Sequence, residues 1–184
     1  MFDSIVDPTV GSDVAPDRAR AGLAPRPADL EGLSLGLLAN TKRNAEQFLE
    51  DVASLMREQY GVKPVLARKK LSITHPVPAE MLDELAACDI VVTGVGDCGS
   101  CSASAVADGL LLEQSGVPSV VICTDAFTVS ADAMAEVQGA PGYRYVTTDH
   151  PVASLNRDGI RARAEKVVPQ IVALLTDAAA AARP

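Results

Sequence analysis

The chain contains no tryptophan, and aromatic residues make up only 3% of its 184 positions. Hydrophobic residues still account for 48% of the sequence, so the core must be built from valine, leucine, isoleucine and alanine. A chain of this length can bury a substantial core as one domain.

Long apolar runs and basic clusters are also missing. No apolar run reaches the length of a membrane span, and the N-terminus lacks the apolar core of a signal peptide. The formal net charge of −8 argues against binding to nucleic acid. We therefore expect a cytoplasmic protein that binds neither a membrane nor nucleic acid. In that reducing compartment, the four cysteines should be catalytic or buried rather than a disulfide framework.

From residue 33 onward, apolar segments of strand length alternate with segments of helical periodicity. Continuous apolar stretches such as Leu33–Ala39 are typical of buried parallel strands. The alternation predicts an α/β domain over residues 33–184, a flavodoxin-like three-layer sandwich with a five-stranded, mostly parallel sheet. The other expected elements are strands at 63–68, 90–92, 119–123 and 143–147, and helices at 44–60, 79–87, 102–115, 130–137 and 159–182.

Residues 1–32 differ from the rest of the chain. They are rich in proline, aspartate, alanine and arginine and show no sustained periodicity, so we expect an extended N-terminal arm. In a short chain, such an arm more often wraps a neighbouring subunit or stays mobile than folds by itself. We therefore expect a homo-oligomer.

The most informative stretch is Ile90–Ser104, with the sequence IVVTGVGDCGSCSAS. It predicts a buried strand that runs into a glycine-rich turn and then a helix, with Cys98 and Cys101 on the turn in CxxC spacing. Aligned amides at a helix N-terminus favour negative charge, so a thiol there should have a lowered pKa. This pattern indicates thiol chemistry, with Cys98 as the nucleophile and Cys101 as a resolving thiol.

Three other interpretations fit parts of this stretch. Gly94–Gly99 satisfies GxGxxG, the dinucleotide fingerprint, but that motif belongs on the first strand of its fold. A structural zinc site needs four ligands, and no second close pair of cysteines or histidines is present. The third alternative is a structural turn with inert thiols. We favour reactive thiols and expect neither a metal nor another cofactor.

Polar residues follow several of the expected strands at the point where each strand ends. Ligands of parallel sheets bind beyond the carboxyl ends of the strands, so these turns should meet at one edge. Asn40 or Thr41 is also a plausible N-cap for the first helix. The candidate substrate-binding residues at this edge are Asn40, Thr41, Lys42, Asn44, Gly94, Gly96, Asp97, Gly99, Ser100 and Thr124.

Some of the candidates have equally plausible structural roles. His150, one of two histidines, is placed at a strand end where a general acid or base is useful, but it could be an exposed loop residue. Lys42 could bind a carboxylate or be merely solvated. Asp97 would tend to raise the pKa of the adjacent thiol, unless it orients a substrate or points away. Cys88 and Cys123 are expected to be packing residues.

The run VVTGVGDCGSC resembles the motif of the UGSC family, in which selenocysteine or cysteine occupies the first position of U/C-G-S-C. LLANTKRN, VICTDAF and Asp149-His150-Pro151 are similar too, with a weaker match at Asp7-Pro8-Thr9, and the likeness spans most of residues 33–152. The resemblance implies that Cys98 stands at the selenocysteine position of this selenoprotein-related family. Cysteine there would be a weaker nucleophile with the same role.

Two further likenesses are more distant. The chain resembles the selenocysteine subunit of glycine, sarcosine and betaine reductases, which cleave a carbon–nitrogen bond through a carboxymethyl group held on selenium. Their motif differs from CGSC, so the resemblance is a poor guide to the substrate and reaction of this chain. The chain is also similar to half of an aspartate/glutamate racemase, which needs two facing cysteines and would here require a shared site or Cys123.

The leading hypothesis is a thiol-dependent oxidoreductase or lyase. Cys98 attacks a small, polar, carboxylate-bearing substrate, and Cys101 releases the product by forming a disulfide that a thiol reductant or partner subunit reduces. One alternative is a cofactor-free lyase or racemase-like enzyme in which cysteine acts as a base. The other is a sulfur- or redox-carrier subunit of a larger complex.

Overall fold

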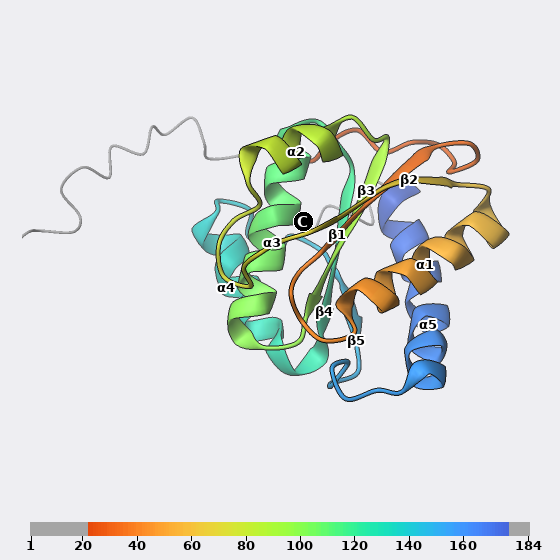
Figure 1. Ribbon diagram of the computed structural model, residues 1–184. Helices are drawn as coiled ribbons and strands as arrows, with labels where there is room; N and C mark the ends of the chain where they lie inside the picture. Colours follow the sequence, from red (N-terminus) through yellow and green to blue (C-terminus); the bar gives the residue numbers. More distant parts are fainter. Residues whose placement is uncertain (1–21, 177–184) are drawn as a thin grey trace, which may run out of the picture.

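Strands and helices alternate along the chain, as the apolar pattern predicts. The computed structural model describes residues 22–176 (Figure 1). In chain order the elements are β1 (Ser34–Ala39), α1 (Ala45–Tyr60), β2 (Lys63–Lys69), α2 (Ala79–Ala86), β3 (Ile90–Gly96), α3 (Gly99–Gln114), β4 (Ser119–Thr124), the 3₁₀ turn η2 (Asp125–Phe127), α4 (Thr128–Val137), β5 (Val146–Thr148) and α5 (Arg157–Thr176).

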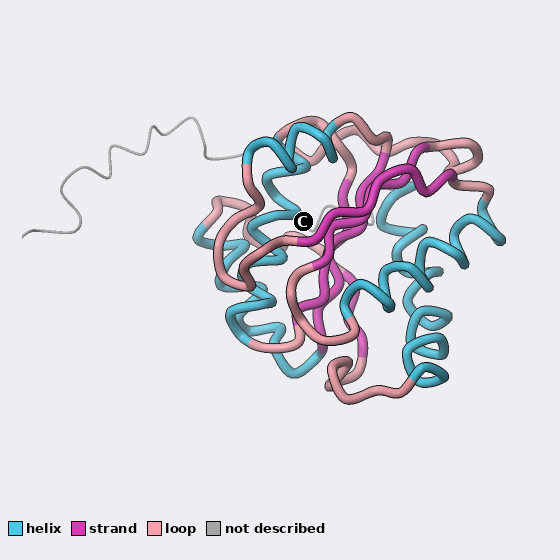
Figure 2. Tube along the Cα trace, viewed as in Figure 1, coloured by secondary structure: helices cyan, strands magenta, loops and turns pink. Residues whose placement is uncertain are grey.

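The five strands form one sheet in the order β2-β1-β3-β4-β5, and every pair is parallel. This is the predicted flavodoxin-like topology, all-parallel rather than mostly parallel. Helices α1 and α5 cover one face, and α2, α3 and α4 cover the other, which gives three layers (Figure 1). Because the strands are parallel, the loops that follow β1, β3, β4 and β5 gather at one end of the sheet (Figure 2).

The core is aliphatic, as the shortage of aromatic residues predicts. Every residue of the central strand β3 is buried, since helices pack on both of its faces. Burial of one aliphatic side chain contributes about 1.5–3 kcal/mol, so this strand anchors the fold. The face of α1 that packs on the sheet contributes the buried residues Ala45, Phe48, Leu49, Val52, Leu55 and Met56.

Helix α3 is buried on most sides because it lies between the sheet and its neighbours α2 and α4. Gly109 allows this close packing, since a Cβ atom there would lie 2.3 Å from Cγ2 of Val121 on β4. The helix therefore cannot shift away from the strand ends without losing core contacts. Its N-terminus is held in place at the edge where the polar turns meet.

Several boundaries differ from the predictions. Helix α3 begins three residues earlier than expected, α4 and α5 each begin two residues earlier, and β5 starts only at Val146. The expected C-terminal end of α5 lies outside the described residues.

The expectation that Asn40 or Thr41 caps α1 is wrong. The N-cap is Asn44, in a left-handed conformation (φ 70°) that asparagine tolerates, and its side chain makes no capping bond. Asn40 lies too far before the helix, and its side chain is engaged elsewhere.

Residues 22–33 precede β1 and form no helix or strand. One arginine of this segment fastens it to the helices. The guanidinium of Arg26, nearly inaccessible to solvent, pairs with Glu113 of α3 at 2.8 Å and donates to the carbonyl of Leu174 on α5 at 3.0 Å. Glu113 also accepts the backbone N–H of Ala24 at 2.8 Å. This segment therefore ties α3 to α5.

The first 21 residues of the expected arm lie outside the described residues, so the arm and the boundary at residue 32 stay predictions. Between residues 22 and 176, no helix is long and apolar enough to cross a membrane.

Candidate active site

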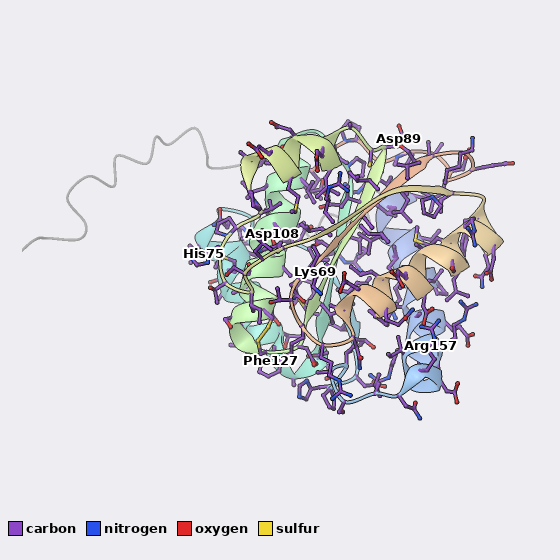
Figure 3. All side chains as sticks on the ribbon, in the orientation of Figure 1. Lys69, His75, Asp89, Asp108, Phe127 and Arg157 are labelled. Atoms are coloured by element: carbon purple, nitrogen blue, oxygen red, sulfur yellow. A yellow bond between two sulfur atoms is a disulfide. The ribbon has the colours of Figure 1, made fainter. Side chains whose placement is uncertain are left out.

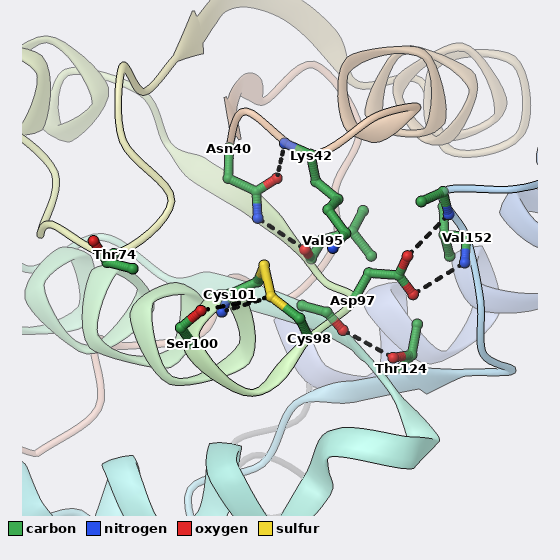
Figure 4. Close-up of a disulfide and its surroundings, with 12 residues drawn as sticks. Asn40, Lys42, Thr74, Val95, Asp97, Cys98, Ser100, Cys101, Thr124 and Val152 are labelled. Atoms are coloured by element: carbon green, nitrogen blue, oxygen red, sulfur yellow. Dashed lines mark hydrogen bonds between the residues drawn. A yellow bond between two sulfur atoms is a disulfide. The ribbon is translucent and has the colours of Figure 1, made fainter.

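The CxxC pair lies where β3 ends and α3 begins (Figure 4). Cys98 is the N-cap of α3, and its sulfur accepts a hydrogen bond from the backbone N–H of Cys101 at 3.3 Å. The two sulfurs are joined in a disulfide, with the Cα atoms 5.2 Å apart, inside the usual range of about 4.4–6.8 Å. The predicted ability of the pair to form a disulfide is confirmed. A helix amide also reaches the Cys98 sulfur, as the expected activation requires.

The two sulfurs differ in their access to solvent. Cys101 is fully buried, whereas Cys98 is half-buried and its neighbour Ser100 is exposed. The hydroxyl of Ser100 lies 3.6 Å from the Cys98 sulfur. In Figure 3 the disulfide, drawn in yellow, lies at the end of the molecule where Phe127 is labelled. A small molecule can therefore approach Cys98 but not Cys101.

Gly94 and Gly96 serve the packing of β3 rather than the approach of a substrate. Both are buried, and a Cβ atom on Gly96 would lie 2.6 Å from Oγ of Ser102 and 2.7 Å from Sγ of Cys123. A Cβ atom on Gly94 would lie 2.9 Å from a backbone oxygen of β4. Only small residues fit there, because α3 and β4 press against the strand end. Gly99, beside the thiol, is the partly exposed glycine of the three.

The carboxylate of Asp97 points away from the disulfide, toward the segment after β5 (Figure 4). It is almost completely buried and accepts the backbone N–H groups of Val152 at 3.0 Å and Ala153 at 2.9 Å. Its Oδ1 also lies 2.9 Å from Nδ1 of His150. Of the alternatives open for Asp97, the structure shows the one in which it faces away from the thiol and has other partners.

His150 is placed at this edge by contacts on several sides. Its Nδ1 lies 3.3 Å from Oγ1 of Thr124, and its backbone N–H donates to Asp125 at 3.0 Å. Its ring meets that of Phe127 edge-on, with centroids 5.2 Å apart. Its side chain is 36% exposed, so one side of the ring is held while the other is open. The sequence analysis did not single out Asp125 or Phe127, although both stand directly after a strand in VICTDAF.

The two asparagines of the first turn hold backbone segments together. Asn40 donates to the carbonyl of Val95 at 2.8 Å and accepts the backbone N–H of Lys42 at 3.0 Å. The amide of Asn44 lies within 3.2 Å of three carbonyl oxygens in the segment 152–155. Because these amides are already engaged, we give both residues structural roles.

Lys42 extends from the same turn toward the β3–α3 junction (Figure 4). It is half-buried, and its ammonium makes no hydrogen bond or ion pair with any described residue, while its neighbour Thr41 is exposed. An unpaired cation in this place is suited to bind an anion. The carboxylate-binding role of Lys42 stays a prediction.

The sequence analysis missed a buried ion pair close to the site. The ammonium of Lys70 contacts Oδ2 of Asp108 at 2.5 Å and Oγ of Ser104 at 2.8 Å, and Asp108 also accepts the backbone N–H of Val77 at 2.8 Å. Burial raises the pKa of the Asp108 carboxyl, against the opposing effect of Lys70. The pair holds the loop 70–77 against the middle of α3. The available signal was Asp108, a charged residue among the small and apolar residues that fill α3 from Gly99 to Leu112.

The two other cysteines are free and buried. Burial raises the pKa of Cys123 to about 12 and also raises that of Cys88. Burial therefore disfavours the thiolate form of both residues, in line with their expected packing roles. Within residues 22–176, no group of three or more histidine, cysteine or acidic side chains is arranged to hold a metal ion.

Comparison with known proteins identifies the family of this chain. The model of the UGSC family matches residues 4–177, which include the CxxC pair and His150. The chain belongs to the UGSC family. This confirms the resemblance carried by the VVTGVGDCGSC run, and Cys98 is the first residue of CGSC in this UGSC-family chain. No curated protein shows significant similarity to it.

Proposed function

We propose that this UGSC-family protein is a thiol-dependent enzyme that reductively removes a leaving group from a small carboxylate. The observation that carries the proposal is the pairing of Cys98, the N-cap of α3, with the buried Cys101 in one disulfide. An accessible sulfur at a helix N-terminus, backed by a second sulfur within bonding distance, is what a nucleophile and its resolving thiol need.

In the first step, the thiolate of Cys98 in the reduced protein attacks the electrophilic carbon of the substrate. A carbon–sulfur bond forms while the bond to the leaving group breaks, and the leaving group keeps the bonding electron pair. The backbone N–H of Cys101, 3.3 Å from the sulfur, stabilises the thiolate before the attack.

In the second step, the thiolate of Cys101 attacks the sulfur of Cys98. The disulfide forms, the carbon–sulfur bond breaks, and the released carbon takes the electron pair and a proton from His150. The substrate has then gained two electrons, and a hydrogen replaces its leaving group. An external dithiol reduces the disulfide and completes the cycle.

The substrate class follows from the groups that surround Cys98. The backbone N–H groups of Gly99 and Ser100, the first two of α3, have no carbonyl partner within the helix and favour an oxyanion, and Lys42 supplies an unpaired positive charge. The net charge of −8 works against long-range attraction of anions, so this selectivity must be local. We therefore place a carboxylate next to the carbon that Cys98 attacks.

Chloroacetate tests this proposal, because it carries a carboxylate beside an electrophilic carbon. The reduced protein is incubated with chloroacetate, quenched in acid and analysed by mass spectrometry, with Cys98→Ser as the control. We expect a Cys98–Cys101 disulfide, acetate as the product, and repeated turnover only with an added dithiol. Glycolate formed while both thiols stay free would indicate displacement of chloride by water and would contradict the reductive step. No reaction until a partner protein is added would indicate a carrier subunit.

A further inference from the structure

We infer that Asp97 and Thr124 are positioning residues that hold the ring of His150 in its Nδ1–H tautomer, so that Nε2 is the nitrogen that exchanges protons. That this proton goes to the carbon released from Cys98 is an assumption taken from the proposed function. The tautomer is a property of the protein alone and can be measured without any substrate.

Two oxygen atoms face Nδ1 of His150. Oδ1 of Asp97 lies 2.9 Å away, and Oγ1 of Thr124 lies 3.3 Å away. The hydroxyl hydrogen of Thr124 is used on the carbonyl of Gly96 at 3.0 Å, so toward the histidine this oxygen acts as an acceptor. A carboxylate also accepts only. Without a hydrogen, Nδ1 would face the lone pairs of both oxygens, so the hydrogen belongs on Nδ1.

The carboxylate of Asp97 is itself fixed, which is what a positioning residue needs. It is 1% exposed and is held by the backbone N–H groups of Val152 and Ala153, directly after the His150-Pro151 bond. The same side chain thus orders the loop and orients the ring. Asp97 also directly precedes Cys98 in the chain. The turn that carries the thiol therefore also carries the carboxylate that contacts His150.

The other ring nitrogen of His150 is free. Nε2 makes no hydrogen bond with any residue between 22 and 176, and the side chain is partly exposed. With the hydrogen fixed on Nδ1, Nε2 of the neutral ring takes a proton from solvent and, once protonated, gives it to the released carbon. The adjacent carboxylate holds the ring in this orientation during the exchange, as an aspartate does for histidine in catalytic triads.

The test is ¹⁵N NMR of the imidazole nitrogens, on the oxidised protein without substrate, at a pH where the ring is neutral. The chain has two histidines, so His75→Gln leaves His150 as the single ring signal. We expect the Nδ1–H form to exceed the Nε2–H form at least tenfold. In Asp97→Ala/Thr124→Val, that ratio should fall at least fivefold.

A matched control separates ring positioning from loop order. Asn44→Gly removes three contacts to the loop 152–155 without touching the ring, and glycine tolerates φ 70° at that position. This variant should keep the Nδ1–H form. If the double variant does not fold, the tautomer ratio of His150 is measured in Thr124→Val and in the parent protein, and these two values still test the inference.

An Nε2–H ring in the parent protein, or a ratio that the double variant leaves unchanged, would overturn the inference. The Nδ1–H form in a protein that never reacts with chloroacetate would overturn the proposed function and leave the tautomer assignment intact. In an active protein, Asp97→Ala should slow acetate release at least tenfold while changing alkylation of Cys98 much less. Equal slowing of both steps would contradict the positioning role.

Discussion

The sulfur of Cys98 and the backbone nitrogen of Cys101 lie 3.3 Å apart in the first turn of α3, and the same two residues are joined through their sulfurs. Cys101 therefore supplies both the amide that contacts the Cys98 sulfur and the second sulfur of the pair. In the proposed reaction, that second sulfur attacks Cys98 and displaces the carbon bound to it. The amide belongs to the helix backbone, so it stays in place when the disulfide is reduced.

After reduction, Cys98 should react with iodoacetamide at neutral pH much faster than the buried thiols of Cys88 and Cys123. Burial raises the pKa of Cys123 to about 12, so roughly one molecule in 10⁵ carries its thiolate at pH 7. Peptide mass mapping over time measures the rates, and labelling in denaturant shows that every site can react. Slower labelling of Cys98 than of Cys88 would exclude Cys98 as the nucleophile.

Cys98→Ser should abolish the reaction with chloroacetate and leave the fold intact. A serine oxygen is a good N-cap acceptor, so the free energy of unfolding should stay within about 1 kcal/mol of the reduced parent protein. Cys98→Ala, which loses the cap, should be about 1 kcal/mol less stable than Cys98→Ser. Urea unfolding under reducing conditions gives these values. A largely unfolded Cys98→Ser protein would mean that the residue is mainly structural.

Lys42→Ala should weaken substrate binding more than turnover. Loss of one charge-assisted hydrogen bond, about 1.4 kcal/mol, should raise KM for chloroacetate about tenfold. Sulfate should compete with the substrate in the parent protein and less in the variant. Arg43→Ala is the matched control, because Arg43 is an exposed cation on the same turn. Unchanged KM in Lys42→Ala, or an equal effect in Arg43→Ala, would contradict carboxylate binding by Lys42.

Lys70→Met should lower the free energy of unfolding by about 3–5 kcal/mol, since it leaves the buried carboxylate of Asp108 unpaired. The double variant Lys70→Met/Asp108→Leu should recover much of that loss. Burial raises the pKa of Asp108, so the folded state binds the proton more readily than the unfolded state. The deficit of Lys70→Met should therefore shrink as the pH falls toward 3.8, the ordinary value for aspartate. Urea titrations across this range check both expectations, and a deficit independent of pH would contradict them.

The layers of the fold and the place of the thiols were predictable from sequence because both leave local signals. Continuous apolar strands alternate with helical periodicity, and parallel strands bring their carboxyl ends to one edge. Glycines after a buried strand predicted the turn at Cys98. Helix starts were less predictable: Asn44 in a left-handed conformation begins α1, although Asn40 and Thr41 are equally good cap types.

The partners of the polar side chains were not predictable in the same way. Asp97 bonds to residues 55 and 56 positions further along the chain, and Lys70 bonds to a residue 38 positions away. Contacts between such distant positions produce no periodicity in the sequence. Glycines 94 and 96 illustrate the same limit, because the need for a small residue there comes from β4 and α3 packing against the strand.

The most direct test of the account is a single turnover with isotope-labelled chloroacetate and reduced protein from which external thiol has been removed. The account predicts one acetate and one Cys98–Cys101 disulfide for each protein that reacts. In Cys101→Ser, the carboxymethyl group should stay on Cys98 and no acetate should form. Acetate formed by Cys101→Ser at the parent rate, or formed by the parent protein with both thiols still free, would contradict the account.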